Sequence, residues 1–222
     1  MSGLFRLLAK RIETKNNNIG NFEEETSRYA IARAELACIP RDLEGAETIA
    51  GYPCKPPTTI TVDDFVYKFT EATPNNFNIS ITPTFVDQLP ALNGLGFSIA
   101  KAELEEGGVV PLHSHPDATE VVIVGQGNVT AGFISSTDNN VFVTSLSEGN
   151  IMVLPRGLLH FIINIGIGKA KGTFIFTSVR PGSQIIDLAL FGNDFDSTLI
   201  SKTTFLDPEQ IKKLKGIFKG SG

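Results

Sequence analysis

Short apolar segments separated by turn-forming residues dominate the chain beyond about residue 60. Gly, Pro, Asn or Asp residues separate these segments, which lie at 97–104, 109–115, 120–124, 129–134, 141–146, 151–154, 160–164 and 173–179. Strands of this length at this spacing are typical of a β-sandwich or a β-barrel. The pattern therefore predicts an all-β domain.

The end of the chain changes to a helical period. Asp207 suits the N-cap of a helix and Pro208 suits its first position. The apolar residues that follow fall on one helical face, namely Ile211, Leu214, Ile217 and Phe218. We expect this face to pack on the barrel or on a neighbouring subunit.

Residues 1–30 differ from the rest, with charge clusters and an Asn run but no apolar stretch of the length that a secretory signal has. Three interpretations remain open: a leader added for expression, a native extension that packs on the domain, or a misassigned start that hides a true signal. Residues 31–222 show no internal repeat and are expected to form one domain.

Composition narrows the class of protein. Hydrophobic residues make up 41% of the chain and charged residues only 19%, which argues against disorder. The 16 Phe, 21 Gly and 12 Pro favour short strands and tight turns over a helical bundle. The net charge is −5 and the chain has no basic block, so we expect no positive surface that could bind the phosphates of nucleic acid. No apolar run has the length of a membrane-spanning helix.

Cys38 and Cys54 are the only cysteines. They are either two free thiols or a disulfide that closes a short loop, worth roughly 3 kcal/mol in the chain-entropy model and implying an oxidising compartment. Asn78 and Asn128 begin N-x-S/T glycosylation sequons. Together with the cysteines, these sequons favour secretion.

A histidine pair carries the clearest chemical signal. His113 and His115 are two residues apart in an extended segment, so their imidazoles project into the same space. Glu120 is the only charge in the apolar segment 120–124. Left unpaired in a dry interior, its carboxylate would cost several kcal/mol. A divalent cation on neutral imidazoles supplies the partner that it needs.

The third and last histidine is His160, in the apolar segment 160–164. One histidine on an apolar strand is more often a core residue than a ligand, but here all three histidines lie in two motifs that adjacent strands can bring together. Three imidazoles and one carboxylate suit Mn, Fe, Ni or Cu better than a structural zinc site. With a divalent ion the site would carry about +1 and keep open positions, which favours chemistry on superoxide or a small carboxylate.

The two motifs resemble the characteristic boxes of the germin and germin-like proteins of the cupin superfamily. Residues 107–127 fit G-x5-H-x-H-x3,4-E-x6-G, and residues 149–164 fit G-x5-P-x-G-x2-H-x3-N, both without exception. Residues 91–96 and the tail are especially similar to the auxin-binding protein 19/20 subgroup. The resemblance covers the chain from about residue 36 to its end.

The resemblance implies a single jelly-roll β-barrel with C-terminal helices. It also implies secretion to the plant cell wall or apoplast, glycosylation, and a homohexamer built as a trimer of dimers. Cys38 and Cys54 correspond to the amino-terminal disulfide of the family. The family's metal is manganese, and the positions of its ligands correspond to His113, His115, Glu120 and His160.

Oxalate-oxidising members carry two asparagines in the pocket, and the corresponding residues here are Ala100 and Val110. Oxalate would lose roughly 1–3 kcal/mol for each polar contact that is missing. The substitution argues against oxalate oxidase. Asn164 is the last residue of the second box. We expect it at most to hydrogen-bond to a metal ligand, without touching the metal itself.

Three functions stay open. The first is a redox enzyme of the superoxide dismutase type, in which the metal changes oxidation state. The second is a non-catalytic binding or storage protein for a small, auxin-like ligand. The third is a cupin recruited to specialised metabolism, in which the pocket walls select the substrate.

Overall fold

The computed structural model describes residues 57–222. The expected leader at 1–30 and the cysteines Cys38 and Cys54 lie outside the described residues. The chain divides into two compact units, Met1–Phe65 and Val66–Gly222. The described part of the first unit forms two short 3-10 helices, η1 (Pro57–Thr59) and η2 (Val62–Phe65).

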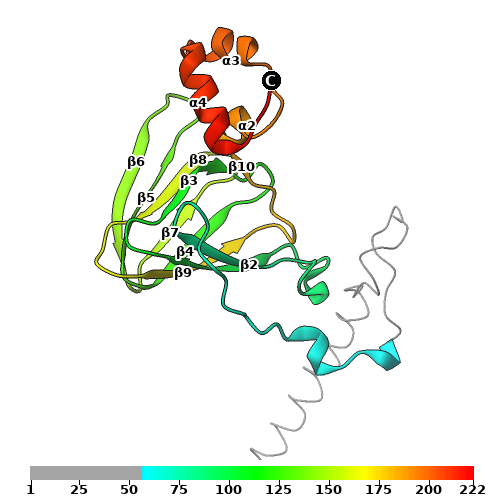
Figure 1. Ribbon diagram of the computed structural model, residues 1–222. Coiled ribbons are helices and arrows are strands. Elements are labelled where there is room, and N and C mark those ends of the chain that lie inside the picture. Colours follow the sequence, from blue (N-terminus) through cyan, green and yellow to red (C-terminus); the bar gives the residue numbers. More distant parts are fainter. Residues whose placement is uncertain (1–56) are drawn as a thin grey trace, which may run out of the picture. The chain divides into compact units, whose positions relative to one another are not determined.

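The second unit contains two five-stranded antiparallel sheets (Figure 1) and a 3-10 helix, η3 (Pro90–Leu92), before its second strand. The first sheet has the order β1 (Ile79–Thr84), β2 (Ser98–Leu104), β9 (Ala170–Phe176), β4 (Glu120–Gln126) and β7 (Ile151–Leu154). The second has the order β10 (Gln184–Ile185), β3 (Val109–Ser114), β8 (Leu159–Asn164), β5 (Asn128–Ile134) and β6 (Val141–Ser147). The expected all-β jelly roll is confirmed.

The short apolar segments predict eight of these ten strands, β2 to β9, to within three residues at each end. They miss β1, which contains Pro83. Proline cannot donate to the hydrogen-bond ladder, and β1 tolerates it because β1 lies at the edge of its sheet. They also miss β10, whose two residues are too few to show a period.

The main core lies between the two sheets. Along β2 and β4 every second residue is buried, as the period of a half-buried strand requires. Ala100 and Val122 of the first sheet belong to the same apolar cluster as Ala131 and Ile162 of the second. This core fixes the strands on which the candidate site is built.

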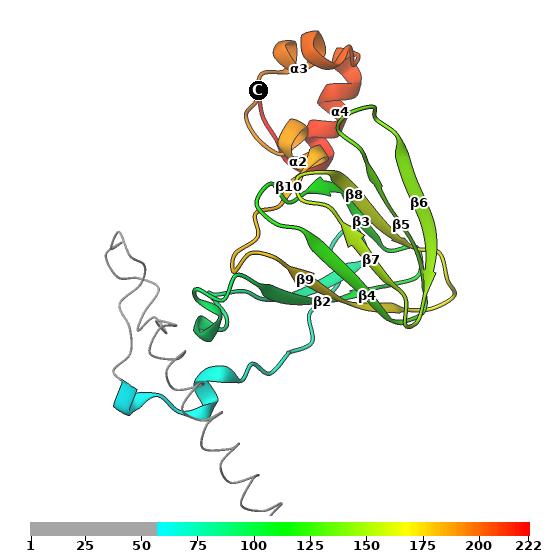
Figure 2. The same cartoon turned by 180° about the vertical axis from the view of Figure 1, so that it is seen from behind.

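Three helices follow the strands: α2 (Ile186–Phe191), α3 (Ser197–Thr204) and α4 (Pro208–Phe218). They gather at one end of the sheets (Figures 1 and 2). The predicted start of α4 is confirmed, because the side chain of Asp207 accepts a hydrogen bond from the Glu209 N–H and Pro208 occupies the first helical position.

The apolar face of α4 packs on the other C-terminal helices and not on the barrel, which is one of the two partners expected for it. Ile211 forms a small core with Phe191 of α2 and Ile200 of α3, and the face covers these helices rather than the barrel. Ile217 stays 57% exposed, because the stripe that α2 and α3 cover is narrower than the predicted face. Among the described residues, no helix is both long and apolar enough to span a membrane.

Candidate metal centre

Four side chains converge between the two sheets. His113 on β3 lies directly opposite His160 on β8, and His115 follows the end of β3. Glu120 begins β4 in the other sheet. One potential ligand atom from each of the four residues lies within 4.8 Å of all the others, and every one of these side chains is buried. The structure thus brings together the three histidines and the carboxylate that the two sequence motifs contain.

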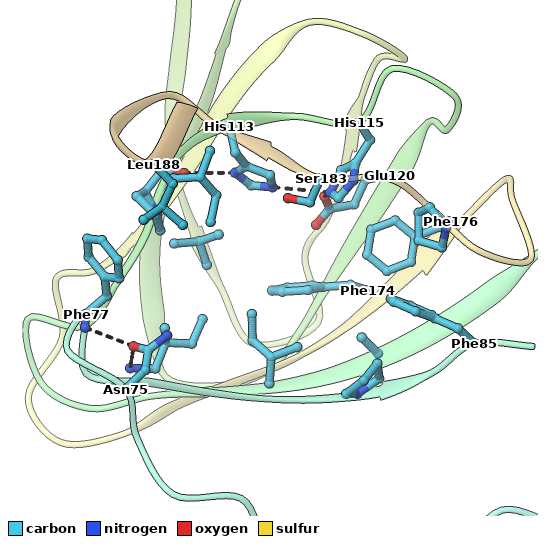
Figure 3. A pocket seen from close by; sticks show the side chains of 18 residues that line it. Asn75, Phe77, Phe85, His113, His115, Glu120, Phe174, Phe176, Ser183 and Leu188 are labelled. Atoms are coloured by element: carbon cyan, nitrogen blue, oxygen red, sulfur yellow. Dashed lines mark hydrogen bonds and ion pairs between the residues drawn. The ribbon is translucent and has the colours of Figure 1, made fainter. Parts of the chain in front are cut away.

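The Nε2 atoms of the rings face the centre of this cluster. His113 Nε2 lies 3.2 Å from His115 Nε2, and Glu120 Oε2 lies 3.2 Å from the Nε2 atoms of both His115 and His160. Figure 3 shows the His113 and His115 rings beside the Glu120 carboxylate. Nitrogen and oxygen donors are therefore grouped as they would be around one ion.

Backbone carbonyls fix the opposite nitrogen of each ring. His113 Nδ1–H donates to the Pro111 carbonyl at 2.8 Å, and His160 Nδ1–H donates to the Leu158 carbonyl at 2.8 Å. His115 Nδ1–H donates to the Gly182 carbonyl at 2.5 Å. With its proton on Nδ1, a neutral imidazole presents the Nε2 lone pair to a metal.

Charge interactions shift the pKa values in the cluster. Burial raises the pKa of the Glu120 carboxyl, but hydrogen bonds from His115 and His160 outweigh burial and bring this pKa down to about 2. Burial lowers the pKa of His113 to about 4, with a contribution from repulsion by His160. For His115 burial is outweighed by hydrogen bonds to Glu120 and Gly182, so its pKa is raised. Without a metal, these shifts favour the carboxylate form of Glu120 and the neutral form of His113.

These residues fit a bound divalent cation. Glu120 is 2% exposed and ionised, and a cation is the partner that such a carboxylate needs. The three Nε2 atoms and the carboxylate form a mixed nitrogen and oxygen set without thiolate, which suits Mn, Fe, Ni or Cu. The buried His-His-Glu-His cluster therefore suits a metal ion.

A cavity of about 450 Å³ adjoins the cluster. His113, His115 and Glu120 form its polar end, while most of the remaining wall is apolar (Figure 3). The apolar side chains include Ile79, Phe85, Ala100, Val110, Phe174, Phe176, Ile185 and Leu188. Both positions at which oxalate oxidisers carry asparagines, Ala100 and Val110, thus line this cavity.

A strand irregularity explains how Val110 reaches the cavity. In a regular strand His113 and Val110 would face opposite sides, because they are three residues apart. The pairing of β3 with β8 shifts register between these two residues, and both line the cavity. Alternation alone could not have placed Val110 there.

The structure does not bring Asn164 to the cluster. Its amide nitrogen donates to the carbonyls of Leu104, Glu105 and Gly168, and its oxygen accepts from the Gly166 N–H. These partners belong to the end of β2 and to the turns that follow β2 and β8. Asn164 therefore ties backbone segments together.

The sequon asparagines Asn78 and Asn128 are exposed at the beginnings of β1 and β5.

The sequence did not reveal the role of Gly182 as the acceptor for His115, since a backbone carbonyl leaves no signal in the residue type. Phe174 and Phe176 of β9 also contribute to the site. Both are buried and line the cavity, and the Phe176 ring packs edge-on against His115 at 5.0 Å.

Comparisons with known proteins agree with this geometry. The profile of the cupin family matches residues 68–212. The auxin-binding protein ABP20 of Prunus persica is 49% identical over 183 residues, which are 81% of this chain and 85% of that protein. The germin-like protein subfamily 3 member 1 of Arabidopsis thaliana is 48% identical over 200 residues, covering 87% and 95%. A solved structure of oxalate oxidase superposes with a TM-score of 0.76 at 32% identity, covering 82% of this chain and 94% of that one. The chain belongs to the germin-like proteins of the cupin family.

Proposed function

We propose that this protein is a manganese-binding enzyme that removes superoxide and that it does not oxidise oxalate. The observation that carries the proposal is the convergence of three Nε2 atoms and one carboxylate oxygen at the polar end of a cavity. When bound, manganese would supply one-electron redox chemistry. The net reaction converts two superoxide anions and two protons into dioxygen and hydrogen peroxide.

The ligands set the charge that an incoming anion meets. Three neutral imidazoles and the Glu120 carboxylate leave about one positive charge on a divalent ion. The apolar walls of the cavity screen this charge less than water does, so the attraction for a small anion is strengthened. The Nδ1–H bonds to backbone carbonyls keep the rings aligned during the reaction.

The wall beside the cluster argues against oxalate as a substrate. Ala100 and Val110 are 1% and 6% exposed and offer no side-chain donor to the second carboxylate of oxalate. Each unmet contact costs roughly 1–3 kcal/mol. Superoxide needs no such donors, because it is small and carries a single charge.

Superoxide removal by manganese-loaded protein tests the proposal, with His113→Ala as the variant that loses a ligand. Ser114→Ala is the matched control, because it changes the same strand on the opposite face. We expect the wild type and the control to remove superoxide and the His113→Ala variant to be inactive. Equal activity in His113→Ala would reject metal-based catalysis.

A second candidate function is the binding of a small organic acid such as an auxin. The size and apolar wall of the cavity favour it, since superoxide uses little of a volume near 450 Å³. The similarity to auxin-binding proteins of Prunus persica adds support. Binding predicts that indole-3-acetate raises the melting temperature of the metal-loaded protein and that acetate, which lacks the apolar body, does not. No shift with indole-3-acetate would reject this candidate.

We also propose secretion to the plant cell wall, with a Cys38–Cys54 disulfide, glycans on Asn78 and Asn128, and assembly into a hexamer as a trimer of dimers. Exposed apolar side chains on the terminal strands of the two sheets support assembly, namely Val141, Phe142 and Val143 on β6 and Ile151 and Val153 on β7. Sedimentation velocity should show a hexamer for the purified protein, and a monomer would contradict the assembly.

A further inference from the structure

We propose that Asp117 is a positioning residue for the metal centre, because it holds the loop whose Gly182 carbonyl orients the ring of His115. The inference rests on the metal-binding part of the proposed function and is independent of the reaction catalysed. Its basis is a difference between the three histidines.

Two of the histidines are oriented by carbonyls close to them in the sequence. The carbonyl that accepts from His113 Nδ1–H belongs to Pro111, two residues earlier. His160 Nδ1–H likewise donates to the carbonyl of Leu158, two residues earlier. His113 and His160 pair with each other across β3 and β8, so each ring and its acceptor belong to one short segment beside this pair.

His115 depends on a distant segment. It lies just beyond the last residue of β3, and its Nδ1–H donates to the carbonyl of Gly182, 67 residues away. Gly182 lies in the connection between β9 of the first sheet and β10 of the second (Figure 2). The position of this connection therefore decides where the acceptor for the His115 Nδ1–H lies.

The carboxylate of Asp117 holds the connection at two points. Its Oδ1 accepts a hydrogen bond from the Gly182 N–H at 3.0 Å, and its Oδ2 accepts one from the Ser178 hydroxyl at 3.0 Å. Asp117 itself lies two residues after His115, in the turn that leads to Glu120. The Asp117 side chain thus links the carbonyl that orients His115 to the turn between His115 and Glu120.

Loss of this carboxylate frees the peptide of Gly182 to move. The His115 ring then loses its fixed Nδ1–H acceptor, and its Nε2 atom is no longer held toward the other ligands. Changes to outer partners of metal-bound histidines cost about 10–100-fold in metal affinity. We expect Asp117→Ala to weaken Mn²⁺ binding by that factor.

Two further variants separate positioning from general stability. Asp117→Asn retains an oxygen that accepts from the Gly182 N–H, and the Ser178 hydroxyl can rotate to accept from the new amide. Asp138→Ala is the matched control, since Asp138 is also exposed and also holds a turn, through Ser135 and Asn140 between β5 and β6. We expect both variants to bind Mn²⁺ as the wild type does.

The experiment combines Mn²⁺ titration calorimetry with NMR of the Zn²⁺-loaded protein labelled with ¹⁵N-histidine. Only three histidines exist, so three imidazole N–H signals are expected. In Asp117→Ala, one signal should exchange faster with solvent while the other two stay protected. In Asp117→Asn and Asp138→Ala, all three should stay protected.

Unchanged Mn²⁺ affinity and three equally protected signals in Asp117→Ala would overturn the proposal. So would an equal loss of protection at all three rings, which would indicate a general structural role. A wild type that binds no Mn²⁺ would overturn this inference together with the proposed function. A wild type that binds Mn²⁺ but leaves superoxide unchanged would overturn the proposed reaction and leave the role of Asp117 standing.

Discussion

Replacing Glu120 by glutamine removes one negative charge from the cluster and keeps the shape of the side chain. The pKa of Glu120 falls from the usual 4.5 to about 2, because hydrogen bonds from His115 and His160 outweigh burial. At ~1.36 kcal/mol for each pH unit, this displacement corresponds to about 3 kcal/mol in favour of the carboxylate. Glutamine resembles the protonated acid, so we expect metal-free Glu120→Gln to unfold about 3 kcal/mol more easily at pH 6.

The sign of this effect can be tested with pH. Because the folded pKa of Glu120 lies below its unfolded value, its contribution is complete above about pH 4.5 and is lost as the pH falls toward 2. The difference in unfolding free energy between the wild type and Glu120→Gln should therefore close over that range. It should stay constant between pH 5 and 6.

Urea unfolding followed by circular dichroism provides the assay, since the chain has no Trp to report by fluorescence. Glu148→Gln is the control, because Glu148 is exposed in the turn between β6 and β7. Glutamine also removes the only negative charge among the four ligands, so we expect weaker Mn²⁺ binding as well. A Glu120→Gln variant with wild-type stability at pH 6 and affinity within threefold of the wild type would refute the reasoning.

Three further predictions follow from buried groups. The double variant Ala100→Asn/Val110→Asn gives oxalate the two missing donors. Calorimetry should show that oxalate binds to the metal-loaded variant at least about 30-fold more tightly than to the wild type. Unchanged binding would show that the wall does not exclude oxalate. Lys215→Met leaves the carbonyls of Asn193, Phe195 and Ser221 without their buried ammonium donor. Hydrogen exchange in α2, α3 and α4 should then speed up by the equivalent of about 2–4 kcal/mol, with the exposed Lys212→Met as control, and exchange equal to that control would contradict the assignment. Burial lowers the pKa of His113 to about 4 in the folded protein. Between pH 6.5 and 4 the unfolded chain therefore binds a proton that the folded chain does not. The unfolding free energy of the metal-free protein should fall as the pH falls through this range. His113→Gln should reduce that slope in urea unfolding, and an unchanged slope would contradict it.

Short apolar segments separated by turn residues predict the strands well, because strand residues that face the core must be apolar and the connections contain Gly, Pro, Asn or Asp. In β4 the segment 120–124 begins the strand, and its buried residues then alternate from Glu120 to Val124. The same alternation predicts that His113 and His115 project into one space, as they do. His160 could be added because the chain has no other histidine.

Features that depend on irregular backbone were not predictable in this way. The register shift that turns Val110 into the cavity is invisible to alternation, and only the resemblance to a family pointed to this residue. The Gly182 carbonyl is a backbone group, so no residue type marks it. The packing of α4 against α2 and α3 could not be predicted either. The apolar face of α4 shows that it is buried, but not which element covers it.

Anomalous diffraction from a manganese-loaded crystal tests the metal centre most directly. With data collected on both sides of the manganese absorption edge, we predict one strong difference peak within coordination distance of the Nε2 atoms of His113, His115 and His160 and of a Glu120 carboxylate oxygen. A peak at any other position, or none in a crystal soaked with Mn²⁺, would contradict the account.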